Sequence, residues 1–168
     1  MLEIISGNLC SLLAMITDAI GSTRKTARGV LTMQTISQIF FIAGSIALKG
    51  YSAAVQNVMS VIRNLTAIRG LRLPWLEWAL IAGGVVLGIA FNNLGVVGLL
   101  PVIANLEYSL GVFRFKDNER ALKASFLINV ILFTVFNGFI YNFVGVCANT
   151  VVAATTAISL WQSRPRRG

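Results

Sequence analysis

The side chains of this sequence that could bind a ligand are mostly carboxamides and hydroxyls, set at helical spacing inside apolar runs. Asn57, Ser60 and Asn64 are spaced i, i+3 and i+7, so a helix would place all three on one face. Spacings of three, four or seven residues give one such stripe in each of six segments: Asn8, Ser11 and Asp18; Gln34, Gln38 and Ser45; Asn57, Ser60 and Asn64; Pro101, Asn105 and Tyr108; Ser125 and Asn129; Asn142, Asn149 and Thr156.

Six polar stripes that face a common axis would form a polar path through a helical bundle. Carboxamides at its middle could hydrogen-bond a neutral, hydroxyl-rich solute from both sides. We therefore predict a solute-binding set of five residues: Asn57, Ser60, Asn149, Gln38 and Asn129. The alternative is that these side chains tie helices together, at roughly 0.6 to 2 kcal/mol for each bond.

Three charged residues also lie within the apolar runs, each within about two helical turns of a basic flank. They are Asp18, Arg63 and Glu107. An ion in hydrocarbon is costly, so such groups pair or snorkel to the interface. We predict that Arg63 bridges a carboxylate to form a gate, with snorkelling as the alternative and proton coupling through a carboxylate as a third option.

Several classes of chemistry are absent from the sequence. It has no histidine, which excludes Ser-His-Asp and Cys-His catalytic sets. Cys10 and Cys147 lie inside apolar runs without metal-ligand spacing. No phosphate-binding GxxxxGK[ST] motif is present. We therefore expect no enzyme activity, no metal and no cofactor.

The composition is that of an integral membrane protein. Of the 168 residues, 56% are hydrophobic and 12% charged, whereas soluble domains are about 25% charged. The mean hydropathy is +0.77. The net charge of +8 flanks the apolar segments and forms no stripe, so lipid is the expected partner and nucleic acid is not.

We predict an all-α integral membrane protein with seven transmembrane helices, since spans of about 20 residues would fill most of the chain. Glu3 stands where a signal peptide would carry positive charge, so the first segment is expected to be a retained span. The predicted helices are Leu2–Ile20, Val30–Leu48, Ser52–Ile68, Trp75–Phe91, Leu94–Phe113, Ala121–Gly138 and Ile140–Trp161.

The basic residues predict the orientation. Thirteen of the fourteen fall on one side: Arg24, Lys25, Arg28, Arg63, Arg69, Arg72, Arg114, Lys116, Arg120, Lys123, Arg164, Arg166 and Arg167. Lys49 is alone on the other. Cytoplasmic loops carry the excess of Lys and Arg, so we expect the N-terminus outside and the C-terminus inside.

A weak internal repeat relates the first three segments to the last three. At an offset of 90, Tyr51, Val61, Thr66, Ala67 and Ile68 match Tyr141, Val151, Thr156, Ala157 and Ile158. The predicted organisation is a three-helix repeat over 1–70, a linker helix over 71–93, a second repeat over 94–161 and a basic cytoplasmic tail over 162–168. Such a 3+1+3 plan is the parallel-repeat arrangement of the SWEET sugar facilitators.

Three further features have a functional and a plain structural interpretation. Pro101 inside a helix would remove one backbone bond, giving either a hinge or a static kink. Gly84 and Gly88 form a GxxxG pair, which favours tight packing on a neighbouring helix or a seam in a homo-oligomer. The three tryptophans on the side with the basic residues predict an aromatic belt at the membrane interface: Trp75, Trp78 and Trp161.

Short motifs resemble the YgjV-type family of bacterial inner membrane proteins. They are Leu99-Leu100-Pro101-Val102-Ile103, the Ile62-Arg63 and Ile68-Arg69 pairs, and Phe136-Asn137-Gly138. The resemblance implies a location in the bacterial inner membrane and a fold similar to the SWEET and PQ-loop proteins. The sequence departs from true PQ-loop proteins in lacking the Pro-Gln pair, and its first segment has no proline.

Two functions remain open at this point. The polar stripes favour a small carrier that moves a small polar solute, sugar-like or similar, by alternating access between two three-helix repeats. The absence of mid-membrane tryptophans and of prolines in the first segment favours a non-transporting protein of the same fold, acting as an interaction partner or sensor.

Overall fold

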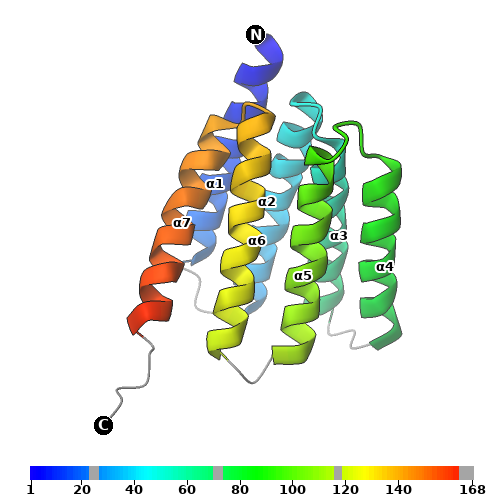
Figure 1. The fold of residues 1–168 in the computed structure, drawn as a ribbon, viewed down its shortest axis with the longest axis vertical. Helices are drawn as coiled ribbons and strands as arrows, with labels where there is room; N and C mark the ends of the chain where they lie inside the picture. Colours follow the sequence, from blue (N-terminus) through cyan, green and yellow to red (C-terminus); the bar gives the residue numbers. More distant parts are fainter. Residues whose placement is uncertain (23–26, 70–73, 116–118, 163–168) are drawn as a thin grey trace.

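The computed structural model describes residues 1–22, 27–69, 74–115 and 119–162, whose secondary structure consists of helices joined by short turns and loops, with no strand (Figure 1). Seven α-helices and one short 3-10 helix, η1, follow one another: α1 (Leu2–Ser22), α2 (Ala27–Ala47), α3 (Tyr51–Ile68), α4 (Pro74–Ala90), η1 (Val97–Leu99), α5 (Leu100–Phe115), α6 (Glu119–Phe139) and α7 (Phe143–Gln162). The prediction of an all-α chain with seven helices is confirmed for these residues.

The helices run along one axis, and α1 begins at the opposite end of the bundle from the end of α7 (Figure 1). We call one end the basic end, because α1, α3, α5 and α7 finish there and most of the Lys and Arg residues lie near or after these helix ends in the sequence. The other end, with the tight turns after α2 and α6, is the turn end. Lys49 is the basic residue at the turn end.

Six of the helices form a closed ring. The neighbours in order are α1, α2, α3, α5, α6 and α7, and α7 packs back against α1. Within the described ranges, α2 makes no close backbone contact with α5, α6 or α7 across the ring. The junction of α3 with α5 corresponds to the junction of α7 with α1, which is the relation that a repeat of three helices produces.

Polar groups are buried and large apolar side chains are exposed, the reverse of a soluble protein. Buried polar residues are about as numerous as buried hydrophobic ones: Ser11, Ser37, Ser52, Gln56, Ser60, Asn64, Ser125 and Asn142. The outer face of α6 instead exposes Ile128, Ile131, Val135 and Phe139. Such a surface suits contact with lipid chains.

By length and composition, two helices of the described chain could cross a membrane on their own, at Leu2–Gly21 and Phe143–Trp161. Four others have shorter apolar stretches, and α3 has none that qualifies. The polar stripe of α3, which includes Gln56, Asn57, Ser60 and Asn64, accounts for its low hydropathy. That all seven helices cross the membrane is part of the proposed function.

The predicted start of the fifth helix at Leu94 is wrong. The side chain of Asn92 accepts a bond from Leu94 N at 3.0 Å and donates to Gly95 O at 2.7 Å, which forms a tight loop. Gly95 has a φ of 56°, a conformation that favours glycine. Because α5 begins at Leu100, Pro101 lies in its first turn, where no helical N–H bond is lost. The mid-helix kink predicted at Pro101 is therefore absent.

The turns after α2 and α6 have the same structure. Lys49 and Tyr141 both have a φ of 60°. In one turn Lys49 N donates to Ile46 O and Gly50 N to Ser45 O; in the other, Tyr141 N donates to Gly138 O and Asn142 N to Asn137 O. These are matching helix C-caps. The offset between them is 141 − 49 = 92, close to the offsets of 90 and 91 at which the sequence matches itself.

Helix α4 packs outside the ring, over the junction of α3 with α5. Gly84 and Gly88 are buried there against Gln56 and Val102. The glycine pair thus serves packing within the chain and is not free for a second copy, so the predicted homo-oligomer seam on this face is not supported. Gln56 Nε2 also donates to Gly84 O at 2.8 Å, which fixes α4 to α3.

Candidate functional site

An apolar plug fills the ring at the turn end. It consists of Leu48, Ala53, Phe136 and Ile140, with Phe136 fully buried. Leu94, Val97, Leu100 and Phe133 pack against it. Because its members come from both repeats, the plug joins the two halves of the ring and closes it at this end.

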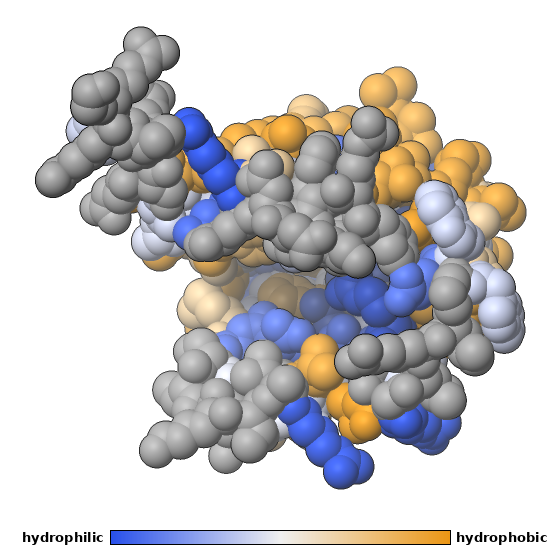
Figure 2. All heavy atoms as spheres, turned by 90° about the horizontal axis from the view of Figure 1, so that it is seen from below, coloured by the Kyte–Doolittle hydropathy of each residue, from blue (hydrophilic) through white to orange (hydrophobic). Residues whose placement is uncertain are grey.

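A hollow lies on the other side of the plug. Seen from the basic end, the space-filling surface is hollowed at its centre, and hydrophilic side chains gather in and beside the depression (Figure 2). Helical spacing shows what faces it. Gln34 and Phe41 share a face of α2 with the plug residue Leu48, yet Gln34 is exposed. The ring is therefore closed at the turn end and open at the basic end.

Asn57 and Asn149 lie on half-buried helix faces of the ring. Asn57 lies one turn after Ala53 of the plug, on the same face of α3. Asn149 lies on the half-buried face of α7, opposite the exposed Cys147 and Val151. Both side chains are half-buried, and in the described part of the chain neither carboxamide has a hydrogen-bond partner.

The other three predicted binding residues differ in their surroundings. Ser60 shares the face of Asn57, but its hydroxyl donates to Gln56 O of its own helix at 3.1 Å. Asn129 Nδ2 donates to Ala104 O at 2.9 Å and so ties α6 to α5. Gln38 is half-buried with a buried Oε1 that lacks a partner among the described residues. Gln38 can still take a ligand, whereas Asn129 is committed to helix packing.

The three predicted gate residues are not brought together. Glu107 accepts a bond from Ser125 Oγ at 2.8 Å. Arg63 is exposed near Tyr108, and Asp18 lies beside Ser37, whose buried hydroxyl has no bond of good geometry within the described residues. No ion pair joins Arg63 to either carboxylate in the described chain. A gate at the basic end would thus be open in this structure.

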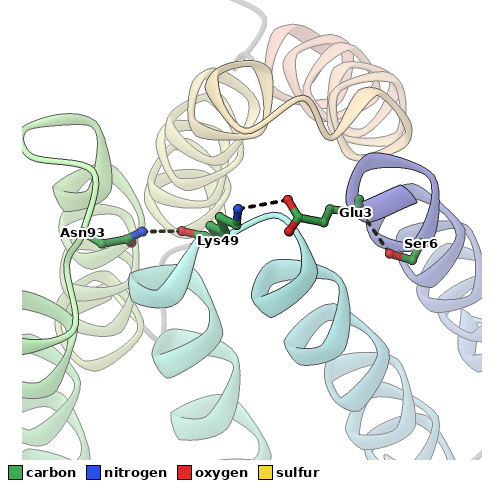
Figure 3. Close-up of polar contacts among 4 residues, drawn as sticks. All are labelled: Glu3, Ser6, Lys49 and Asn93. Carbon is green, nitrogen blue, oxygen red and sulfur yellow. Dashed lines mark hydrogen bonds and ion pairs between the residues drawn. The ribbon is translucent and has the colours of Figure 1, made fainter. Parts of the chain in front are cut away.

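The turn end is instead sealed by polar contacts (Figure 3). Lys49 Nζ pairs with Glu3 Oε2 of α1 at 3.0 Å, and Asn93 Nδ2 donates to Lys49 O at 2.8 Å. On the other side of the ring, Asn8 Nδ2 donates to Tyr141 O at 2.8 Å. Each junction between the repeats therefore has an asparagine bonded to the left-handed residue of a turn.

Asn8 makes a second bond across its junction. Its Oδ1 accepts from Val144 N at 3.0 Å, and Asn142 Oδ1 accepts from Gly145 N at 3.0 Å. Together the two side chains cap the N-terminus of α7. Helical spacing predicts Asn8 and Asn142 on the polar path, and these contacts at the turn end were not predicted. The Asn-Asn-Leu-Gly loop at 92–95 and the single Lys on its side were the signals available.

One further cavity, of about 590 Å³, lies between α6 and α7 near the basic end. It is lined by Arg120, Ala121, Ala124, Leu127, Ala157, Leu160 and Trp161. Ala124 shares a helix face with the exposed Ile128 and Ile131, so this groove opens on the outer side of the ring. Among the residues that the structure describes, no three His, Cys, Asp or Glu side chains gather as a metal site would require.

A comparison with known protein families shows to which family the chain belongs and in which membrane the ring of helices lies. The family model Imp-YgjV, described as a bacterial inner membrane protein, matches residues 5–167. The chain belongs to this family. The predicted resemblance and the predicted location in the bacterial inner membrane are thereby confirmed. No curated protein and no solved structure matches the chain, so the similarity to SWEET and PQ-loop proteins is not shown.

Membership of the YgjV family explains the distribution of polarity. The exposed apolar faces of the ring are expected to meet lipid, and water is expected to enter only through the hollow. Trp75 and Trp161, at the basic end, are 65% and 69% exposed, which suits an aromatic belt at a membrane interface.

Proposed function

We propose that this YgjV-family protein is a small carrier that moves a small polar solute by alternating access. The observation that supports it most is the asymmetry of the ring, which is closed by a plug at the turn end and hollow and polar at the basic end. A carrier needs one gate closed while the other is open. A bundle that is held together by apolar helix packing alone needs no polar hollow.

The seven helices would all cross the inner membrane, in a 3+1+3 arrangement with α4 as linker. The ring order and the matching turns at offset 92 support two parallel repeats. The positive-inside rule puts the basic end in the cytoplasm. The structure would then correspond to the inward-open state, with the N-terminus outside.

Asn57 and Asn149 would bind the solute, one from each repeat. Their carboxamides are half-buried and without a partner among the described residues. Loss of either would leave a hydroxyl of the solute unpaired in a low-dielectric site, which costs about 1 to 3 kcal/mol, or roughly ten- to a hundredfold in affinity. The chemistry favours neutral sugars, polyols and similar hydroxyl-rich solutes.

The test is a thermal-shift screen of the purified protein against such solutes, repeated with Asn57→Ala and Asn149→Ala. Thr150→Ala is the matched control, because Thr150 is exposed and its hydroxyl donates to Val146 O of its own helix. A solute that stabilises wild type and the control, but neither asparagine variant, supports the carrier.

The opposite result has its own interpretation. If no solute shifts the wild type and both asparagine variants melt early, the asparagines are structural. The chain would then be a non-transporting membrane protein that acts as a partner or sensor of another component.

A further inference from the structure

The groove between α6 and α7, of about 590 Å³, has no role in the proposed carrier. Small side chains line both of its walls, Ala121 and Ala124 on α6 and Ala157 on α7, so a ligand can lie between the two helices. Leu127 and Leu160, both half-buried, add apolar contact area. The volume lies within the usual range of ligand pockets, about 300–1,000 Å³.

The groove opens on the side of the ring that faces the membrane. On α6, Ala124 shares a face with the exposed Ile128 and Ile131. On α7, Ala157 and Trp161 are both exposed and lie one turn apart. The chain belongs to a family of bacterial inner membrane proteins, so lipid is the molecule that meets this face. Apolar walls of this kind suit an acyl chain.

Polar donors lie at the end of the groove that is nearest to the basic end of the bundle. Arg120 lines the groove in the first turn of α6, and its side chain is exposed. A guanidinium can bind a phosphate through two parallel N–H donors. Trp161 lines the groove near the end of α7, and its indole N–H can donate to a phosphate or ester oxygen. The net charge of the chain is +8, which favours an anion at such a place.

We propose that this groove binds an anionic phospholipid. Its phosphate lies at Arg120 and Trp161, and one acyl chain lies along the alanines of α6 and α7. Basic pockets between transmembrane helices bind anionic headgroups in this way. A zwitterionic lipid gains less from Arg120, because its headgroup carries a compensating positive charge. The site lies outside the ring, so it does not depend on the proposed carrier function.

The first experiment is native mass spectrometry of the delipidated protein with dioleoyl-phosphatidylglycerol or, at equal concentration, dioleoyl-phosphatidylcholine. The two lipids share their acyl chains, so a difference in binding reports on headgroup charge. Wild type should bind phosphatidylglycerol more tightly. Arg120→Gln should weaken that binding about fivefold, the effect of one arginine near an anionic lipid, and leave phosphatidylcholine binding unchanged. Higher salt should reduce the preference in wild type, because it screens the charges.

Arg69→Gln is the matched control for the charge. Arg69 is also exposed at the basic end, but it follows α3, which makes no close backbone contact with α6 or α7 in the described ranges. This variant should bind phosphatidylglycerol as tightly as wild type does. Because Arg120 and Arg69 are both exposed, both variants should fold and melt with the wild type in the absence of lipid.

A second pair of variants tests the groove itself. Ala124→Phe places a large side chain in the groove, and because Ala124 is exposed the protein should still fold. It should lose the bound phosphatidylglycerol. Ala154→Phe is the control, because Ala154 is also exposed but does not line the groove. Ala154→Phe should retain the lipid.

Four results would overturn the site. Equal binding of the two lipids by wild type would show that the headgroup charge is not recognised. Equal losses in Arg120→Gln and Arg69→Gln would point to a general positive field. Undiminished binding in Ala124→Phe would place the lipid elsewhere, and a wild-type dimer that Ala124→Phe converts to monomers would mean that a second copy covers the groove. None of these results affects the solute screen, so the lipid site and the carrier can fail separately.

Discussion

Asn57 and Asn149 occupy equivalent positions, each eight residues after the left-handed residue of a matching turn: 57 − 49 = 8 and 149 − 141 = 8. Both are half-buried, Asn57 on α3 and Asn149 on α7. This equivalence does not depend on sequence identity, since the residues around the two turns mostly differ. It depends on backbone geometry, and it is the structural basis on which we propose a solute site between the two asparagines.

The seal at the turn end predicts a first pair of mutants. Asn8→Ala and Asn93→Ala each remove side-chain bonds to a turn of the other repeat, worth about 0.5–1.5 kcal/mol for each bond. We expect faster labelling from outside of a cysteine at Ala53, measured with an impermeant reagent in intact cells. Ser6→Ala is the control, because its hydroxyl bonds only to Glu3 O of its own helix. Equal labelling rates in Asn8→Ala, Asn93→Ala and Ser6→Ala would mean that the asparagine bonds do not restrict access to position 53 from outside.

Gln56 predicts a purely structural effect. Its Nε2 bonds to Gly84 O, and its Oε1 accepts from Asn105 Nδ2 at 2.9 Å, so one buried side chain joins α3, α4 and α5. Gln56→Leu should cost about 1–3 kcal/mol of stability, because its partners are left unsatisfied. The exposed Gln34 provides the control, Gln34→Leu. Thermal melting in detergent measures the difference, and melting points that match would contradict the role of Gln56.

Much of the fold was predictable from the pattern of the sequence. Apolar runs separated by basic or turn residues gave all seven helices to within a few residues, except where side chains shape a loop. At Asn92 the carboxamide bonds to the following backbone, and hydropathy alone cannot show this. The sequence matches predict a repeat at offsets of 90 and 91, whereas the two similar turns lie 92 residues apart, which only the backbone bonds show.

The site was only partly predictable. Polar spacing placed Asn57 and Asn149 on inward faces. It could not separate them from Gln56, Asn105 and Asn129, which are equally polar and tie helices together. Nor could it find the contacts of Asn8 with Tyr141 or of Asn93 with Lys49, since these join residues 133 and 44 positions apart.

Phe136 predicts how the plug responds to loss of volume. Its ring is fully buried between the repeats, and Phe136→Ala should cost about 3–5 kcal/mol. We also expect the cysteine at Ala53 to become accessible from outside. Phe139→Ala is the matched control, because Phe139 on the same helix is 61% exposed. A destabilised protein whose Ala53 cysteine stays protected would show that other residues close the ring.

The orientation is tested by cysteines at two exposed positions in a background without native cysteine. Lys49→Cys, at the turn end, should react with an impermeant reagent in intact cells, and Arg69→Cys, at the basic end, should react only in inside-out vesicles. The excess of basic residues at one end is the reason. The reverse labelling pattern would mean that the basic end lies outside and that the structure corresponds to an outward-open state.

The measurement that tests the central claim most directly is the accessibility of one position in the hollow from both sides of the membrane. Ala153 lies one turn from Asn149 on the same face, so a cysteine there should report on the hollow with little change in volume. Its neighbour Ala154 is exposed on the other face of α7 and provides the control. Both variants are made in the background without Cys10 and Cys147.

Alternating access predicts that the Ala153→Cys protein reacts quickly from the cytoplasmic side and slowly, but measurably, from outside. The Ala154→Cys protein should react from neither side, because lipid excludes the charged reagent. A solute that protects the Ala153→Cys protein from both sides would identify the cargo. Reaction of the Ala153→Cys protein from one side only, under every condition, would contradict the carrier and favour a fixed ring.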